Sequence, residues 1–204
     1  MPDVGAEMMS KQRDILPDVL SFVQEQVPNC PVYLGGSVSR RHERPDSDID
    51  LFVVVADVDA ADVPGGKVEW QEHSFKLVAA TFHEVPIHLH VGSPALLQMF
   101  EKHPWRAYKF LQMERLHDPD GIVQRAMDRV APWFDEHPDA AELWQQWLEE
   151  HRERQLSGGS QLGSLLKQFP SQVPDLWSHL DDMYGDKVAE PGTEDDAKNR
   201  TAHP

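Results

Sequence analysis

The sequence predicts an α+β fold (α/β-type), in which a small mixed sheet packs with helices and is followed by a helical C-terminal region. Short apolar segments separated by turn residues between residues 32 and 91 are typical of strands. From residue 93 onward, apolar residues recur at helical spacing. The 204 residues are enough for one domain with a helical appendage.

Four segments follow from this pattern. Residues 1–14 are predicted to be a flexible N-terminus, and residues 15–92 are predicted to form the core that holds the sheet. Residues 93–185 are predicted to form the helical region. Residues 186–204 are polar and contain Pro and Gly, so they are predicted to be a disordered tail.

The first helix is predicted from a stripe of apolar residues at helical spacing, with Pro17 in its first turn. That stripe comprises Leu16, Val19, Leu20 and Val23. Residues 32–34 are then predicted to form a strand, and a short helix is expected to begin near Ser37. Residues 50–56 are almost continuously apolar, which indicates a strand covered on both faces.

Further strands are predicted at residues 67–70, 75–82 and 85–91, the last two as a hairpin. Helical patterns follow at residues 94–102, 104–115, 119–135 and 140–155. Asp118 and Asp139 are expected to cap the last two helices. Arg106 and Lys109 lie one helical turn apart and are the best candidates for a basic stripe that binds a phosphate-rich partner, but we favour the interpretation that they belong to a solvated helix face. A helix break is expected at residues 157–160.

The most informative segment runs from residue 33 to residue 55. A strand leads into Gly35, Gly36 and Ser37, and glycines allow a backbone to approach phosphates closely. After about ten residues, Asp48 and Asp50 open the next strand, where residues i and i+2 point to the same face. The pattern predicts a phosphate-binding turn that faces a pair of metal-binding carboxylates.

This segment resembles the catalytic signature of the nucleotidyltransferase superfamily typified by DNA polymerase β, in its small stand-alone prokaryotic form. The resemblance covers roughly residues 15 to 130 and is specific at 34 to 53. It implies that Asp48 and Asp50 bind Mg²⁺, which prefers carboxylate oxygens. It also implies a triphosphate site. The residues expected to hold the triphosphate are Gly35, Gly36, Ser37, Arg40 and Arg44.

The superfamily also uses a third carboxylate on a later strand, and there this chain departs from the pattern. His88 stands where an acid is expected, and His90 shares its face. In one interpretation His88 is a catalytic base or a metal ligand, which would favour Mn²⁺ or Zn²⁺ over Mg²⁺. In a second, another acid such as Glu84 fills the role. In a third, the site binds nucleotide but transfers poorly. Both histidines could also be ordinary strand residues facing solvent.

Composition limits the partners. The chain has 35 acidic and 19 basic residues, a formal charge of −16, which disfavours nucleic acid as a partner. Cys30 is the only cysteine, so no intramolecular disulfide can form. The sequence shows no secretory core and no membrane-spanning run, and we expect a cytoplasmic location.

The hypothesis is therefore a metal-dependent nucleotidyltransferase that moves an NMP from an NTP, with ATP the expected donor, to a hydroxyl. The acceptor is expected to be a small molecule or a protein, although a tRNA end stays among the alternatives. The alternative hypothesis is a catalytically weak nucleotide-binding or partner-binding module, for example one related to toxin–antitoxin systems.

Overall fold

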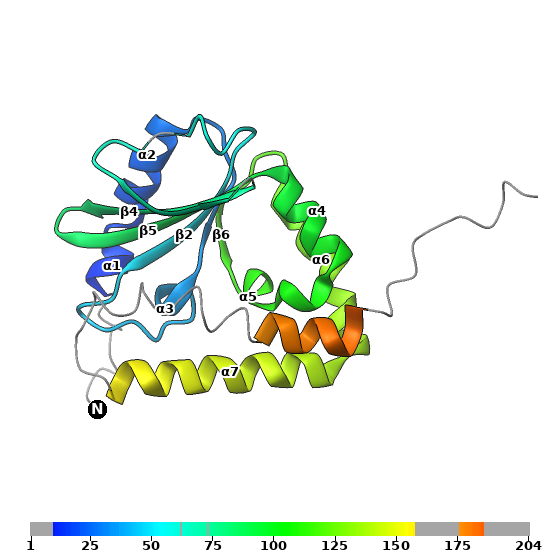
Figure 1. The fold of residues 1–204 in the computed structure, drawn as a ribbon. Coiled ribbons are helices and arrows are strands. Elements are labelled where there is room, and N and C mark those ends of the chain that lie inside the picture. The colour runs from blue at the N-terminus through cyan, green and yellow to red at the C-terminus, as the bar shows by residue number, and fades with distance from the viewer. Residues whose placement is uncertain (1–9, 62, 73, 158–175, 186–204) are drawn as a thin grey trace, which may run out of the picture. The chain divides into compact units, whose positions relative to one another are not determined.

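The computed structural model describes residues 10–61, 63–72, 74–157 and 176–185, and it confirms the predicted α+β fold (Figure 1). The helices before and within the sheet are α1 (Lys11–Asp14), α2 (Leu16–Gln26) and α3 (Gly36–Ser39). The strands are β1 (Val32–Leu34), β2 (Ile49–Val54), β3 (Lys67–Glu72), β4 (Phe75–Phe82), β5 (Val85–Gly92) and β6 (Glu114–His117). The later helices are α4 (Pro94–Lys102), the 3₁₀ turn η1 (Pro104–Arg106), α5 (Tyr108–Leu111), α6 (Ile122–Glu136) and α7 (Pro138–Ser157).

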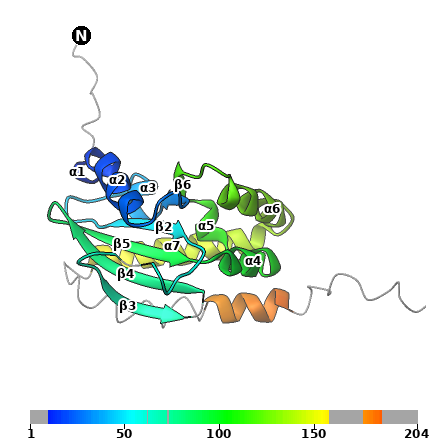
Figure 2. The ribbon, with the colours of Figure 1, turned by 90° about the horizontal axis from the view of Figure 1, so that it is seen from above.

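The six strands form one mixed sheet in the order β3-β4-β5-β2-β1-β6. β2 and β5 are parallel, and the other neighbouring pairs are antiparallel. Figure 2 shows β3 along one edge of the sheet. The parallel pair lies at the centre, and its register sets Asp50 opposite His88. Because paired residues point to the same face, this register determines which side chains of the two strands can meet.

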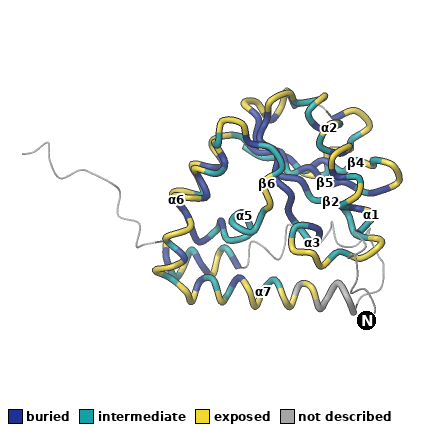
Figure 3. The backbone as a smooth tube through the Cα atoms, turned by 180° about the vertical axis from the view of Figure 1, so that it is seen from behind, coloured by how far each residue is buried: buried dark blue, intermediate teal, exposed yellow. Residues whose placement is uncertain are grey.

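One face of the sheet forms the hydrophobic core with α2. The predicted apolar stripe of α2 is confirmed, since Leu16, Val19 and Val23 are buried there. Alternate residues of the two central strands point to this face and are almost completely buried: Ile49, Leu51, Val53, Ile87, Leu89 and Val91. Figure 3 shows that β2 and β5 are largely buried, whereas α6 exposes its outer side. The intervening residues of β2 and β5 therefore point to the opposite face.

That opposite face is partly covered by α5. Phe110 of α5 packs edge-on against Phe52 of β2, with ring centroids 5.4 Å apart. Oγ of Ser39 in α3 donates a hydrogen bond to the backbone oxygen of Gln112, which follows α5, at 2.9 Å. These contacts hold α5 beside the turn between β1 and α3.

The prediction of one continuous helix over residues 104–115 was wrong. The chain forms η1 and the short helix α5, and residues 114–117 then form β6. β6 pairs with β1 and supplies hydrogen-bond partners to a strand that would otherwise be a sheet edge. This pairing joins residues about 80 positions apart, so the spacing of apolar residues along the chain could not predict it.

Asp118 and Asp139 were predicted to cap two helices. Both helices form, but neither aspartate is the residue directly before its helix. The backbone of α6 begins after Gly121, yet the Asp118 carboxylate accepts hydrogen bonds from the N–H groups of Ile122 and Gln124. Asp139 lies inside the first turn of α7, which begins at Pro138.

The chain divides into two compact units, residues 1–141 and residues 142–204. In the second unit, residues 176–184 are helical, as their apolar spacing predicted. Residues 1–9 and 186–204 and most of the expected break at 157–160 lie outside the described residues, and the four predicted segments stay a prediction. No helix in the described part of the chain combines the length and apolarity that crossing a bilayer requires.

Candidate metal centre

Asp48 and Asp50 lie at the start of β2, on the face opposite the core. Asp48 immediately precedes the strand and Asp50 is its second residue. Ile49 and Leu51 alternate with them and are fully buried in the core. The two apolar side chains therefore anchor the strand so that both carboxylates point away from the core.

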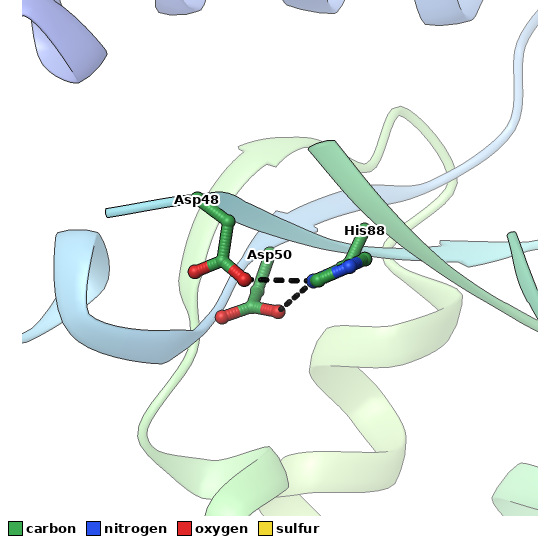
Figure 4. A group of neighbouring side chains, drawn as sticks. All are labelled: Asp48, Asp50 and His88. Carbon is green, nitrogen blue, oxygen red and sulfur yellow. Dashed lines mark ion pairs between the residues drawn. The ribbon is translucent and has the colours of Figure 1, made fainter. Parts of the chain in front are cut away.

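His88 of β5 completes the group, as Figure 4 shows. Its Nδ1 atom is 2.8 Å from Oδ2 of Asp48 and 3.8 Å from Oδ1 of Asp50. One ligand atom from each of the three residues can be chosen so that all lie within 4.8 Å of one another. Two carboxylates and an imidazole nitrogen at this spacing fit a divalent cation. Mg²⁺ prefers the oxygens, whereas Mn²⁺ and Zn²⁺ also accept the nitrogen.

Without a cation, protonation of His88 neutralises part of the negative charge of this group. The hydrogen bond to Asp48 raises the pKa of His88; burial opposes this shift, and the charges of Asp48, Asp50 and Glu69 add to it. Burial alone would raise the pKa of the Asp50 carboxyl, but a hydrogen bond from His90 and the charges of His90, His88 and Lys109 lower it. These interactions lower the pKa of Asp50 and therefore favour its ionised form.

The turn before α3 lies directly against Asp50. The N–H of Gly35 donates a hydrogen bond to the backbone oxygen of Asp50 at 2.8 Å. Gly36 has φ +65°, and a Cβ atom built there would overlap Oδ2 of Asp50 and lie 2.8 Å from its Cγ. A glycine is required at this position both by its backbone conformation and by its contact with the carboxylate.

The other predicted site residues differ in how far their side chains are exposed to solvent. Ser37 is half-buried inside α3, and Arg40 is exposed at the end of that helix. Arg44 is also exposed and pairs with Asp46 at 3.5 Å. Glu84, the alternative acid, is an exposed residue of the β4–β5 turn and does not belong to the group of Asp48, Asp50 and His88. The charge of Arg40 acts on Lys109, and the charge of Lys109 in turn acts on Asp50.

Comparison with known proteins agrees with this geometry. A family model described as "Nucleotidyltransferase domain" matches residues 16–116. Residues 16–116 are a nucleotidyltransferase domain. The match begins with α2 and ends within β6, so it contains Asp48, Asp50 and His88.

Two solved structures are similar to the chain that carries this nucleotidyltransferase domain. The first, "conserved protein GrpB from Enterococcus faecalis", has 14% sequence identity and a TM-score of 0.41, with 85% of this chain and 94% of that chain covered. The second, described as a cytoplasmic RNA terminal U-transferase, has 14% identity and a TM-score of 0.31, with 53% and 38% covered. No curated protein matches the sequence.

The nucleotidyltransferase domain also brings three residues to the site that the sequence analysis did not assign to it. His90 places Nε2 3.3 Å from Oδ1 of Asp50. The sequence could have indicated this, because His90 lies two residues after His88 and therefore on the same face of the strand. The charge of Glu69 in β3 helps to raise the pKa of His88, and within the part of the chain that the structure describes its buried Oε2 has no hydrogen-bond partner.

The third residue is Lys109 of α5, which was interpreted as part of a solvated helix face. It is half-buried instead. Burial lowers its pKa to about 8, while the charge of Asp50 opposes this shift and that of Arg40 adds to it. No sequence signal links Lys109 to Asp50, because the proximity depends on how α5 packs against β2.

Proposed function

We propose that this protein is a metal-dependent nucleotidyltransferase that moves an NMP from an NTP, with ATP the expected donor, to a hydroxyl acceptor. The observation that carries the proposal is the convergence of Asp48, Asp50 and His88 beside the Gly36 turn. A phosphate-binding turn next to a metal-binding group is the arrangement that phosphoryl chemistry requires. The NTP substrate also agrees with the proposed cytoplasmic location.

In the proposed reaction, the acceptor hydroxyl oxygen forms a bond to the α-phosphorus of the NTP. The bond from that phosphorus to the bridging oxygen breaks, pyrophosphate leaves with the electron pair, and the hydroxyl proton passes to solvent. Asp48 and Asp50 would hold the divalent cation, and His88 would take the place of the third acid. The cation, when bound, would supply positive charge that stabilises the developing charge on the phosphates.

The remaining residues would bind the triphosphate. Ser37 and the backbone of Gly35 and Gly36 would contact its oxygens, because this turn lies against Asp50. Arg40 and Lys109 would add positive charge on the same side, and Arg44 would add it from the neighbouring loop. Holding the triphosphate in line with the acceptor is the main contribution that such a site makes to the rate.

The test is transfer of label from α-labelled NTPs in the presence of Mg²⁺, Mn²⁺ or Zn²⁺. Aminoglycosides, protein and tRNA are offered as acceptors, and labelled product is expected with the small molecule or the protein. Asp48→Asn and Asp50→Asn should each lower transfer by at least about 100-fold, since each removes charge that holds the cation. Asp120→Asn, which changes an exposed carboxylate away from the group, is the control.

One observation favours a second candidate function, a catalytically weak nucleotide-binding or partner-binding module. His88 is an imidazole at the third-acid position, and imidazole does not suit Mg²⁺. Nucleotide binding without transfer under all three cations would support this alternative. Equal transfer by wild type and both Asp→Asn variants would overturn the assignment of the site.

A further inference from the structure

Helix α1 lies outside the residues matched by the nucleotidyltransferase family model, yet it contacts the loop that leads to Asp48. Its central residue, Gln12, is only 1% exposed. The Nε2 atom of Gln12 is a hydrogen-bond donor to three backbone oxygens of this loop, those of Arg44 at 2.9 Å, Pro45 at 3.2 Å and Ser47 at 2.9 Å. A buried side chain therefore binds the backbone immediately before the first metal-binding carboxylate.

The chemistry of these contacts requires an amide nitrogen. Nε2 carries two hydrogens, which three carbonyl oxygens share, whereas Oε1 of Gln12 is buried and has no hydrogen-bond partner among the described residues. The opposite amide orientation would place Oε1 against three carbonyl oxygens, which repel it. The three carbonyl oxygens therefore require a hydrogen-bond donor at position 12. A side chain of the same size without a donor cannot replace Gln12.

Other contacts hold α1 firmly enough for Gln12 to act as an anchor. Ser10, which precedes α1, donates a hydrogen bond to Oε1 of Glu43 at 2.6 Å. Nη2 of Arg13 donates to the backbone oxygen of Val38 at 2.5 Å and to Oε2 of Glu114 at 3.2 Å. The helix is therefore fixed to α3, to the following loop and to β6.

The loop needs such an anchor because Asp48 lies outside the sheet ladder. Asp50 and His88 are residues of paired strands, so the β2–β5 register places them. Asp48 precedes β2, and its position depends on the turn formed by residues 44–47. Within that turn, the N–H of Ser47 donates to the oxygen of Arg44 at 3.0 Å, and the N–H of Arg44 donates to Oγ of Ser47 at 2.8 Å.

We propose that Gln12 is a positioning residue: by holding the backbone of residues 44–47, it places Asp48 opposite His88 and Asp50. This inference rests on the proposed function, since it takes Asp48 as a metal ligand. It assigns α1 a role in preparing the metal site, although α1 supplies no ligand. Residues that orient metal ligands typically change metal affinity by about 10- to 100-fold when they are replaced.

The test uses full-length protein and two variants, Gln12→Met and Gln12→Leu, which place an apolar side chain of similar size there and lack the donor. Mn²⁺ affinity is measured by titration, and amide hydrogen exchange of residues 41–50 is measured without metal. Val19→Ala is the control, because it weakens the core beneath α2 without touching the loop. The stability of each variant is measured so that affinities are compared at similar losses of stability.

We expect both Gln12 variants to bind Mn²⁺ about 10- to 100-fold more weakly and to exchange faster over residues 41–50. Val19→Ala should keep wild-type affinity and loop exchange. Wild-type loop exchange in both Gln12 variants, or an equal loss of affinity in Val19→Ala, would overturn the inference. Wild-type protein that binds no Mn²⁺ would overturn the proposed function instead, and hydrogen exchange would still decide whether Gln12 holds the loop.

Discussion

The contact between Gly36 and Asp50 shows how a single residue controls the geometry of the candidate site. Gly36 adopts a left-handed backbone conformation, φ +65°, and its missing side chain leaves the space that the Asp50 carboxylate occupies. A larger residue would change two things at once, the local backbone energy and the position of a proposed metal ligand. These two effects can be separated because another glycine has a left-handed backbone conformation but, within the part of the chain that the structure describes, no neighbouring side chain that a Cβ atom would displace.

Gly65 provides that comparison, since it has φ +72° and a Cβ atom placed on it would meet no atom of the described residues within 4 Å. We expect Gly65→Ala to lower the free energy of unfolding by about 1–2 kcal/mol, the cost of a left-handed alanine, and Gly36→Ala to lower it by more, because its Cβ also overlaps the Asp50 carboxylate. Only Gly36→Ala should also lower Mn²⁺ affinity, because it displaces Asp50. Urea unfolding and Mn²⁺ titration measure the two effects. Equal Mn²⁺ affinity in both variants would contradict the role of this contact.

Cys30 offers a second residue-level prediction, which concerns pH. Burial raises the pKa of its thiol from 9.0 to about 11, and a backbone hydrogen bond partly opposes the shift. The unfolded chain therefore loses this proton at lower pH than the folded protein. The stability that the neutral thiol contributes is complete below pH 9.0 and is lost as the pH rises toward 11.

We therefore expect the difference in unfolding free energy between wild type and Cys30→Ala to be constant below about pH 8. Between about pH 9 and 11 it should change by about 2 kcal/mol against the wild type. Titrations shared by the two proteins cancel in this difference. A difference that stays constant up to about pH 11 would show that the thiol ionises equally in the folded and unfolded states.

At the scale of elements, Asp118 joins β1 to α6. Its carboxylate accepts a hydrogen bond from the hydroxyl of Tyr33 at 2.9 Å and from the N–H groups of Ile122 and Gln124 at 3.0 Å. Burial and this hydrogen bond raise the pKa of the Tyr33 hydroxyl. A buried carboxylate thus satisfies the first turn of α6 and fixes that helix to the sheet.

Asp118→Ala is expected to lower the free energy of unfolding by roughly 2–4 kcal/mol, because it removes three hydrogen bonds to one charged group. Tyr33→Phe should cost about 1 kcal/mol, since it removes one of them. Asp120→Ala changes an exposed neighbour and should stay within about 0.5 kcal/mol of wild type. Urea unfolding followed by tryptophan fluorescence measures all three. Similar losses for Asp118→Ala and Asp120→Ala would exclude the proposed link.

The elements also show what could be predicted from the sequence. The apolar stripe of α2 and the Gly–Ser and Asp–x–Asp spacing are local patterns, so α2, the turn and the adjacent pair of carboxylates were predictable. The even spacing of His88 and His90 placed both on one face, and the structure puts each within reach of an aspartate. The pairing of β6 and the positions of Lys109 and Gln12 depend on contacts between residues about 30 or more positions apart. Such contacts cannot be predicted from the local spacing of apolar residues.

At the scale of the whole molecule, charge is the dominant feature. The chain has 35 acidic and 19 basic residues, a formal charge of −16. Ion pairs such as those of Arg13 with Glu114 and Arg129 with Glu101 each join one base to one acid, so they leave the net charge of −16 unchanged. A compact chain with so large a net charge is destabilised by self-repulsion, and unfolding relieves it.

Salt should therefore stabilise this protein. The Debye length falls from about 30 Å at 0.01 M to about 3 Å at 1 M, so KCl screens the long-range repulsion before it abolishes close, partly buried pairs. We expect the free energy of unfolding by urea to increase as KCl is raised from about 0.01 M to about 1 M. An osmotically matched sucrose series separates screening from solute exclusion, which also stabilises folded chains. A decrease in stability with KCl would mean that the surface ion pairs outweigh the repulsion, and the excess of acidic residues would then not limit the stability of the fold.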